Sequence, residues 1–286
     1  KIAAITGFIL LAVFVIVGAD PAANIGPQNY TNDGGFFPNG LTGMWFAIFI
    51  SLFSYLSIEM IAVSAGEAEN PEKAVPIALK SAVLRLVIFY LLTLSLMLMI
   101  VPWGGAGIEK SPFVKVMEIV GIPGAAGVMN FVVLVAALSA MNSMLYVSTR
   151  MMFSLSRAGF APKAFGKLNK RSVPAVALAT SAIGIAIATL YTIISPATAF
   201  ATMISISSFG AMFTWFMIFI THLKFRKTWD AMGGRKLPVR MIGYPYLTVG
   251  GAALLLLVVL STWYSPDFHE TLKYGIPWLI ILTISY

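Results

Sequence analysis

The stretch GMWFAIFISLFSYLSIEMIAVSA, residues 43–65, decides how this chain is organised. It is long enough to cross a bilayer, which takes about 20 apolar residues. It nevertheless contains Glu59, the only Asp or Glu well inside any long hydrophobic segment of the sequence. An ionised carboxylate at the bilayer centre costs about 2.5–3.5 kcal/mol on insertion scales, so such a residue usually handles protons, ions or substrate. The alternative is a protonated Glu that hydrogen-bonds a neighbouring helix and only holds the bundle together.

The composition indicates an all-α polytopic membrane protein. Of the 286 residues, 59% are hydrophobic and 10% are charged, against about 25% charged in an ordinary soluble domain. The mean hydropathy is +0.88, and no cysteine is present, so no disulfide can form. The chain begins with Lys1 in an apolar run and ends at Tyr286 within another, so we expect it to be part of a longer protein.

Eight apolar segments are expected to form the helices of a single transmembrane domain, residues 1–286. They are residues 2–19, 43–66, 79–102, 125–149, 174–195, 198–221, 245–264 and 274–286. Residues 103–124 are expected to form a loop, and Ser195-Pro196-Ala197 a tight antiparallel connection. Asn70 followed by Pro71 predicts a helix start. The second segment contains no proline, and no glycine after Gly43, so local rules predict that it is one continuous helix.

The basic residues predict which side of the membrane each loop faces. Loops 67–85, 150–173 and 222–243 together hold fifteen of the 19 lysines and arginines. By the positive-inside rule we expect these loops to be cytoplasmic. We also expect a multi-pass protein of the plasma membrane. The net charge of +8 is then an orientation signal for a chain whose partner is the lipid bilayer, and we expect no nucleic acid partner.

Several chemistries are not expected. His222 and His269 lie at the end of a segment and in a loop, whereas an intramembrane hydrolase would need a histidine at depth. No cluster of Asp, Glu and His has metal-ligand spacing, so we expect no enzyme, no metal and no cofactor. Hydroxyl groups, amides and one carboxylate remain at membrane depth, and they could line a cavity for a compact zwitterionic solute. The alternative for each serine is helix packing without further function.

Several motifs in this order resemble the amino acid permeases of the amino acid–polyamine–organocation superfamily, and in particular their bacterial amino acid transporter family. The motifs are Phe53-Ser54-Tyr55-x-x-x-Glu59, Asn70-Pro71-x-Lys73-x-x-Pro76, Val101-Pro102-Trp103, Asn142-Ser143-x-x-Tyr146-x-x-x-Arg150 and Thr221-His222-x-x-Phe225-Arg226, with Trp215 before the last. The resemblance covers nearly the whole chain. It implies helices five to twelve of a twelve-helix protein with two inverted five-helix repeats, the leucine-transporter-like fold.

The resemblance also implies a site. In that fold the first and sixth helices are discontinuous, so it implies an unwound segment around Ser54–Ser57 whose backbone binds the amino group of the substrate. The implied substrate-binding residues are Ser54, Tyr55, Leu56, Ser57, Ser205 and Ser208. The implied proton-coupling residues are Glu59, Lys1 and Ser139, although Lys1 could also be a lysine at the membrane edge that only reaches toward water. Many relatives have glycine where this chain has Ser57, and the hydroxymethyl group narrows the space beside the backbone.

We therefore expect secondary active transport of an amino acid, with protons as the coupling ion and Glu59 as the titratable coupling or gating group. Alternating access would move one helix bundle against the rest. Two alternatives stay open. One is an amino acid exchanger without net proton movement, and the other is a membrane sensor or scaffold that keeps the fold and transports nothing.

Overall fold

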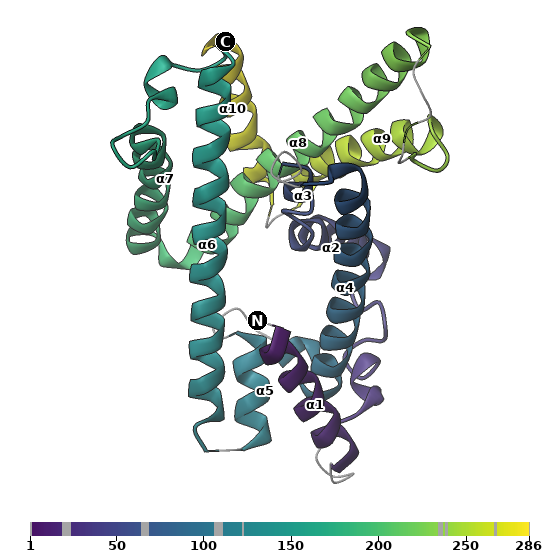
Figure 1. Ribbon diagram of the computed structural model, residues 1–286. Helices are drawn as coiled ribbons and strands as arrows, with labels where there is room; N and C mark the ends of the chain where they lie inside the picture. The colour runs from purple at the N-terminus through teal and green to yellow at the C-terminus, as the bar shows by residue number, and fades with distance from the viewer. Residues whose placement is uncertain are drawn as a thin grey trace. The chain divides into compact units, whose positions relative to one another are not determined.

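The computed structural model of the protein describes residues 2–18, 24–63, 69–105, 111–121, 123–233, 237, 240–265 and 268–285. The described residues form helices and no strands, which confirms the all-α class (Figure 1). The α-helices are α1 (Ile2–Gly18), α2 (Gly40–Ser54), α3 (Met60–Val63), α4 (Pro71–Ile100), α5 (Pro112–Val120), α6 (Ala125–Arg157), α7 (Ala175–Ile194), α8 (Pro196–Ala231), α9 (Tyr246–Ser261) and α10 (Glu270–Ser285). Short 3-10 helices cover Pro27–Tyr30, Trp103–Gly105, Lys163–Gly166 and Thr262–Tyr264.

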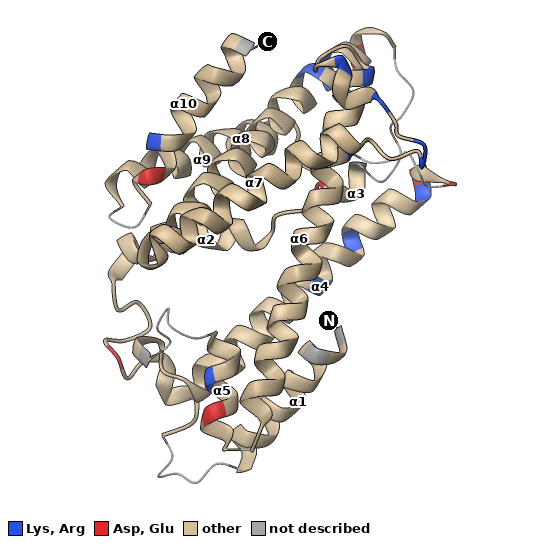
Figure 2. Cartoon of the chain, turned by 90° about the vertical axis from the view of Figure 1, so that its left-hand side faces the viewer, with Lys and Arg blue, Asp and Glu red and all other residues tan. Residues whose placement is uncertain are grey.

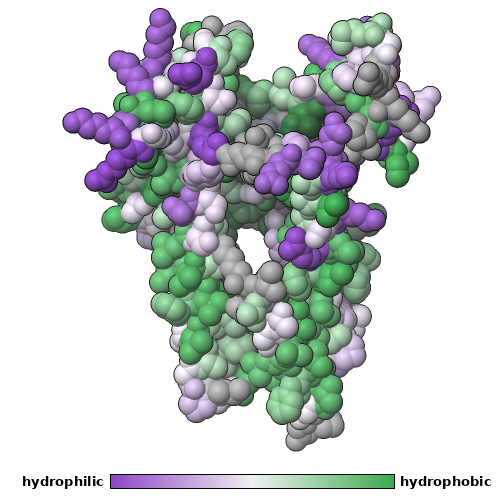
Figure 3. Space-filling view, viewed as in Figure 1, coloured by the Kyte–Doolittle hydropathy of each residue, from purple (hydrophilic) through white to green (hydrophobic). Residues whose placement is uncertain are grey.

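The long helices have the length and composition of membrane spans. Five stretches qualify in the described part of the chain: Pro71–Ile100, Ala125–Arg157, Ala175–Ile194, Pro196–Ala231 and Tyr246–Tyr264. Ile5–Gly18 and Gly40–Ser54 are apolar but shorter. Hydrophobic side chains cover long parts of the helix surfaces (Figure 3), and most lysines and arginines lie in connections or toward helix ends (Figure 2). The protein is therefore a multi-pass membrane protein.

The helix boundaries follow local signals that were readable in the sequence. α4 begins at Pro71, directly after Asn70, as predicted, because proline has no N–H and suits the first helical position. Only Ser195 separates α7 from α8, which begins with Pro196. These two helices also contact each other. The predicted tight connection is confirmed, and the antiparallel arrangement of the two helices stays a prediction.

The expected loop at 103–124 was wrong in part. Pro112–Val120 forms α5, which begins with a proline and ends at Gly121 in the left-handed conformation, φ 72°. Val114, Val116 and Met117 are buried. A proline at the start and a left-handed glycine at the end are the ordinary boundaries of a short helix, so the signal was present in the sequence.

Residues 1–43 and 78–147 form one compact unit. Its core joins Phe8 and Ala12 of α1 with Leu96 and Ile100 of α4 and Val116 of α5. The buried Asn29 side chain donates to the carbonyls of Asn24 and Met99, both at 2.9 Å. Two apolar hollows of about 510 and 470 Å³ lie among α1, α5 and α6. Neither hollow is lined by a candidate site residue.

Residues 44–77 and 148–286 form the second compact unit. Helix α8 is its centre, because α7, α9 and α10 all pack against it. The core brings together Phe49 of α2, Met212 of α8, Leu255 and Val258 of α9, and Phe268. Helix α2 is thus held against α8 and α9 just before the stretch that contains Glu59.

Glycines set the closest approach between helices of this unit. A Cβ at Gly251 of α9 would lie 2.7 Å from the ring of Phe219 on α8. A Cβ at Gly275 of α10 would overlap the ring of Phe209 on α8, which also packs edge-on against Trp278. Small residues at helix crossings let backbones approach closely, which is a major source of packing energy in membranes.

Candidate functional site

The helix that carries the candidate site is broken at the predicted place. α2 ends at Ser54, residues 55–59 form turns, and α3 begins at Met60. The expectation of a continuous helix from local rules was wrong, and the unwinding implied by the resemblance around Ser54–Ser57 is present. No proline or glycine causes this break, so tertiary packing overrides the local helix preference of these residues.

The backbone of the break is wound more tightly than an α-helix. Its hydrogen bonds join residues three apart, from Tyr55 N to Leu52 O at 3.0 Å and from Met60 N to Ser57 O at 3.2 Å. In the described part of the chain, the carbonyl of Leu56 accepts no backbone hydrogen bond. A carbonyl released from a helix in this way is available to a ligand that carries N–H groups.

Ser57 has the most unusual backbone of the break. Its φ of +81° lies in the left-handed region, which costs a residue with a Cβ about 1–2 kcal/mol. Glycine adopts this conformation without that cost. The conformation therefore explains on physical grounds why glycine suits this position, and it shows that serine occupies it here with strain.

Glu59 is held by two hydrogen-bond donors. Its Oε2 accepts from the indole Nε1–H of Trp215 on α8 at 3.0 Å, and its Oε1 accepts a longer bond from the Ser57 N–H at 3.4 Å. The Glu59 side chain is half-buried. The first bond joins residues 156 positions apart in the sequence, and it ties the break to the central helix of the second unit.

The remaining residues assigned to the break differ in exposure. Ser54 is exposed, whereas Tyr55, Leu56 and Ser57 are half-buried. All four residues lie at the end of α2 or in the turn that follows it. Their contact with a substrate stays a prediction.

Ser205 and Ser208 lie on the buried side of α8. They are 0% and 1% exposed, and the Oγ of each has no hydrogen-bond partner among the described residues. With Met212 and Trp215 they recur at spacings of three, four and three residues, so all four share one face of the helix. Ser208 lies about 10 Å along the axis from Trp215. The two serines therefore lie along the same face as the partner of Glu59, roughly two turns or more away.

Ser139 and Lys1, the other two predicted coupling residues, are not part of the break that contains Glu59. Ser139 is exposed on the part of α6 that belongs to the first unit, and its carbonyl accepts the hydroxyl of Ser143 at 2.9 Å. Lys1 lies outside the described residues. The proton-coupling roles of Lys1 and Ser139 stay predictions.

Trp215 is the residue that sequence reasoning missed as a member of the site. It was noted only as part of a family motif. A tryptophan inside an apolar helix carries an N–H that must find an acceptor, and Glu59 was the only acidic side chain at depth. That pairing argument was available from the sequence.

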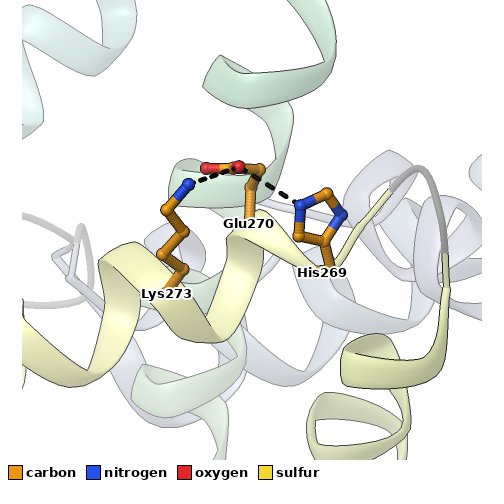
Figure 4. Close-up of polar contacts among 3 residues, drawn as sticks. All are labelled: His269, Glu270 and Lys273. Carbon is orange, nitrogen blue, oxygen red and sulfur yellow. Dashed lines mark hydrogen bonds and ion pairs between the residues drawn. The ribbon is translucent and has the colours of Figure 1, made fainter.

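A separate polar group lies at the start of α10, outside the span predicted at 274–286 (Figure 4). Glu270 Oε1 lies 2.8 Å from Lys273 Nζ and 3.3 Å from His269 Nε2. The hydrogen bond from Lys273 lowers the pKa of Glu270 below its ordinary value, and Glu270 raises the pKa of Lys273 in return. This group is a charge cluster at a helix end and contains none of the predicted site residues.

In the C-terminal part of α8, His222 packs against α9 and against the connection that precedes it. Its Nδ1 lies 3.2 Å from Thr248 Oγ1, and its ring meets the edge of Tyr244. The Arg226 guanidinium lies 4.7 Å from the centre of the Tyr244 ring. These contacts fasten the end of α8 to α9, and they account for His222 without a catalytic role.

The comparisons with known proteins agree with this architecture. A profile of the amino acid permease family matches residues 1–284. The chain is 38% identical over its whole length to an uncharacterized amino acid permease of Bacillus subtilis, YtnA. It is 36% identical over 87% of its length to the gamma-aminobutyric acid permease of B. subtilis. It is also 36% identical over 89% of its length to the D-serine/D-alanine/glycine transporter of Escherichia coli K12.

The chain spans 62%, 53% and 54% of the lengths of these three relatives. The family match, by contrast, covers nearly every residue of the chain itself. With the all-α membrane fold and the break at residues 55–59, it establishes that this chain belongs to the amino acid permease family of the amino acid–polyamine–organocation superfamily.

Proposed function

We propose that the complete gene product carries an amino acid across the plasma membrane by alternating access, as a proton-coupled symporter. The observation that supports this most directly is the break at residues 55–59 inside an apolar helix. Transporters of the inverted-repeat type bind solute at such interrupted helices near the bilayer midplane. The related permeases named above are transporters of amino acids by their names.

The break suits the ammonium group of an amino acid. α2 ends at Ser54, and the last carbonyls of a helix carry partial negative charge. The Leu56 carbonyl, which accepts no backbone bond among the described residues, adds an acceptor just beyond that end. We assign Ser54, Tyr55, Leu56 and Ser57 to the substrate and place the ammonium group against these carbonyls. Ser205 and Ser208 offer two buried hydroxyls without partners on α8 and complete the proposed set.

Glu59 is the proposed proton carrier. It is an acidic group in an apolar segment that has no other, and it belongs to the same break as the proposed substrate groups. A proton bound there neutralises a charge whose presence at membrane depth is costly. Proton binding and rearrangement of the break are therefore linked through one side chain. Lys1 and Ser139 stay in the proposal as further coupling residues.

We further propose that the basic loops 67–85, 150–173 and 222–243 face the cytoplasm. The support is the charge bias, with fifteen of 19 basic residues in these three loops. In this orientation Trp263 and Tyr264, which are exposed at the end of α9, lie at the outer interface, where aromatic side chains are enriched.

The test uses the complete gene product in sealed, sodium-free liposomes. An inward proton gradient is imposed, and uptake of a pooled set of labelled amino acids is compared between wild type and Glu59→Gln. We expect accumulation that depends on the gradient in the wild type and is lost in the variant. Glu72→Gln, at an exposed position in the first turn of α4, is the matched control and should keep it.

Two other outcomes would reject proton symport in different ways. Uptake that requires preloading with amino acid, and that ignores the proton gradient, would identify an exchanger. If protein that is shown to be folded and correctly oriented transports no amino acid, the result would support a membrane sensor or scaffold.

A further inference from the structure

The geometry points to Trp215 as the positioning residue through which the protonation state of Glu59 is transmitted to α8. This inference rests on the proposed function, because it specifies how the proposed proton carrier is connected to the rest of the transporter. It assigns a role to a side chain that would otherwise be read as a hydrophobic residue in a membrane helix.

The chemistry of the two contacts carries the inference. The partners of Glu59 are the Trp215 indole N–H at 3.0 Å and the Ser57 backbone N–H at 3.4 Å. Both groups can donate and neither can accept. The ionised carboxylate satisfies both donors at once. Protonation turns one of the two oxygens into a hydroxyl with less acceptor capacity and turns both charge-assisted bonds into neutral ones, so both bonds become weaker.

The two sides of the pair differ in how firmly they are held. Trp215 lies in a well-packed region, because it belongs with Met212 to the cluster that includes Phe49 and Leu255. Glu59 lies in a short run of turns with i to i−3 backbone bonds. Segments with few regular hydrogen bonds open at low free energy. A weaker Glu59–Trp215 bond therefore loosens the connection between the break and α8.

Of the titratable groups in the elements around the break, we assign the pH response to Glu59. Helix α2 contains no titratable residue, α9 contains only Tyr246, and α7 contains only Tyr191. The first titratable residue of α8 is His222, seven residues and about 10 Å beyond Trp215. The other titratable or charged residues in the described helices and turns of this unit are Tyr55 in the break, Glu69, Glu72 and Lys73 around the start of α4, Arg150 and Arg157 in α6, Lys224, Arg226, Lys227 and Asp230 in α8, and Glu270, Lys273 and Tyr274 in α10. The polar connections hold the rest. His222 lies on the same helix as Trp215, so it needs its own control.

The test combines two readouts on the same proteoliposomes of the complete gene product. Trp215→Phe keeps an aromatic ring in the cluster and removes only the N–H. The first readout is the pH dependence of tryptophan emission, measured in wild type, Trp215→Phe and Glu59→Gln. We expect a transition in the wild type that is absent from both variants. Trp263→Phe, at an exposed position, and His222→Gln are the controls and should keep the transition.

The second readout is proton-driven uptake as a function of pH. Trp215→Phe removes one of the two donors that contact the Glu59 carboxylate, so the uptake profile of this variant should be displaced along the pH axis from that of the wild type. The substrate concentration at half-maximal uptake should stay within about twofold of wild type, because Trp215 acts through Glu59. A merely structural role would change the amount of folded protein and leave the profile in place.

The outcomes separate this inference from the proposed function. An emission transition that persists in Glu59→Gln or in Trp215→Phe overturns the link, whatever the transport data show. An uptake profile of Trp215→Phe that overlays the wild type also overturns it, while proton symport stands. A transition that depends on both residues, found in protein that shows no gradient-driven uptake, supports the link and rejects symport.

Discussion

The indole Nε1 of Trp45 on α2 donates to the hydroxyl of Ser261 on α9 at 2.8 Å. Four residues further along α2, the ring of Phe49 packs against Phe268 with centroids 4.7 Å apart. These contacts hold the helix on the N-terminal side of the break, and the Glu59–Trp215 bond holds the other side. The break is therefore a fixed interruption between two anchors and does not result from a frayed helix end.

The Trp45–Ser261 bond should contribute measurably to stability. Ser261→Ala leaves the half-buried indole N–H without its partner, which costs about 1–3 kcal/mol. Trp45→Phe removes the donor instead, and the double variant should cost less than the sum of the two single variants. Thermal unfolding in detergent micelles measures all three. Additive effects would show that the bond carries no coupling energy.

Replacing Ser57 with glycine should stabilise the protein. The left-handed φ of +81° costs serine about 1–2 kcal/mol, and the greater freedom of glycine in the unfolded chain offsets part of the gain. We expect a net gain of up to about 1 kcal/mol, or a rise of about 2–4 °C in Tm. Ser57→Ala keeps the Cβ and is the control. An equal rise in both variants would mean that the hydroxyl, and not the backbone, is the source of strain.

The same substitution should widen substrate acceptance. Glycine removes the hydroxymethyl group beside the backbone that we assign to the substrate. In the uptake assay, Ser57→Gly should lower the half-saturating concentration for amino acids with bulky side chains relative to glycine and alanine. A uniform change for all substrates would place Ser57 outside the substrate pocket.

The crossing of α8 and α10 should not tolerate a larger residue at Gly275. An alanine Cβ there would overlap the ring of Phe209, and Trp278 packs on that ring. Overpacking of this kind costs about 1–3 kcal/mol. Gly250→Ala in α9 is the control, because its Cβ would meet nothing within 4 Å, and alanine is the better helix former by up to about 1 kcal/mol. Equal Tm values for the two variants would contradict the close packing.

The Glu270–Lys273 pair should make stability depend on pH in a defined window. The pKa of Glu270 is lowered from 4.5 by the Lys273 hydrogen bond, so its contribution is present above pH 4.5 and is lost as the pH falls through the folded-state pKa. The pKa of Lys273 is raised from 10.5, so the pair persists below that pH and is lost as the pH rises through the higher folded-state value.

Glu270→Gln should therefore lower Tm near pH 7 and approach the wild type as the pH falls through the lowered pKa of Glu270. Unfolding curves of both proteins across this range measure the difference. A constant difference at all pH values would assign the effect to packing of the side chain. Asp230→Asn, at an exposed position near the end of α8, is the control.

Residues 1–286 contain no cysteine, so a thiol introduced into this part of the chain can test the proposed orientation, with the protein before substitution as the labelling background. Lys167→Cys in the loop between α6 and α7, and Tyr264→Cys after α9, each introduce a single thiol at an exposed position. In intact cells, a membrane-impermeant maleimide should label Tyr264→Cys and should label Lys167→Cys only after lysis. The reverse pattern would invert the topology.

The features that the sequence predicted are those set by neighbouring residues or by composition. The start of α4 at Pro71 and the turn at Ser195-Pro196 depend on helix propensity and capping, which are readable within a few residues. The site was different. Residues 53–63 have an ordinary helical composition, and their interruption depends on packing with α8, 156 residues further along the chain.

Two other misses have the same physical origin. α5 was overlooked because its apolar residues make sense only beside α1 and α4, although Pro112 and Gly121 marked its ends. Trp215 was overlooked because a hydrogen bond between distant residues leaves no local pattern. Only the requirement that a polar N–H in a membrane helix find an acceptor connected it with Glu59.

Helix α8, which carries Trp215, is long enough to extend beyond the membrane. The helix has 36 residues and spans about 54 Å, against about 30 Å for the hydrocarbon core. No proline interrupts it after Pro196, so α8 is one continuous helix with Trp215 near its middle. If α8 tilts about its middle, its basic end with Lys224 and Lys227 is displaced further than Trp215.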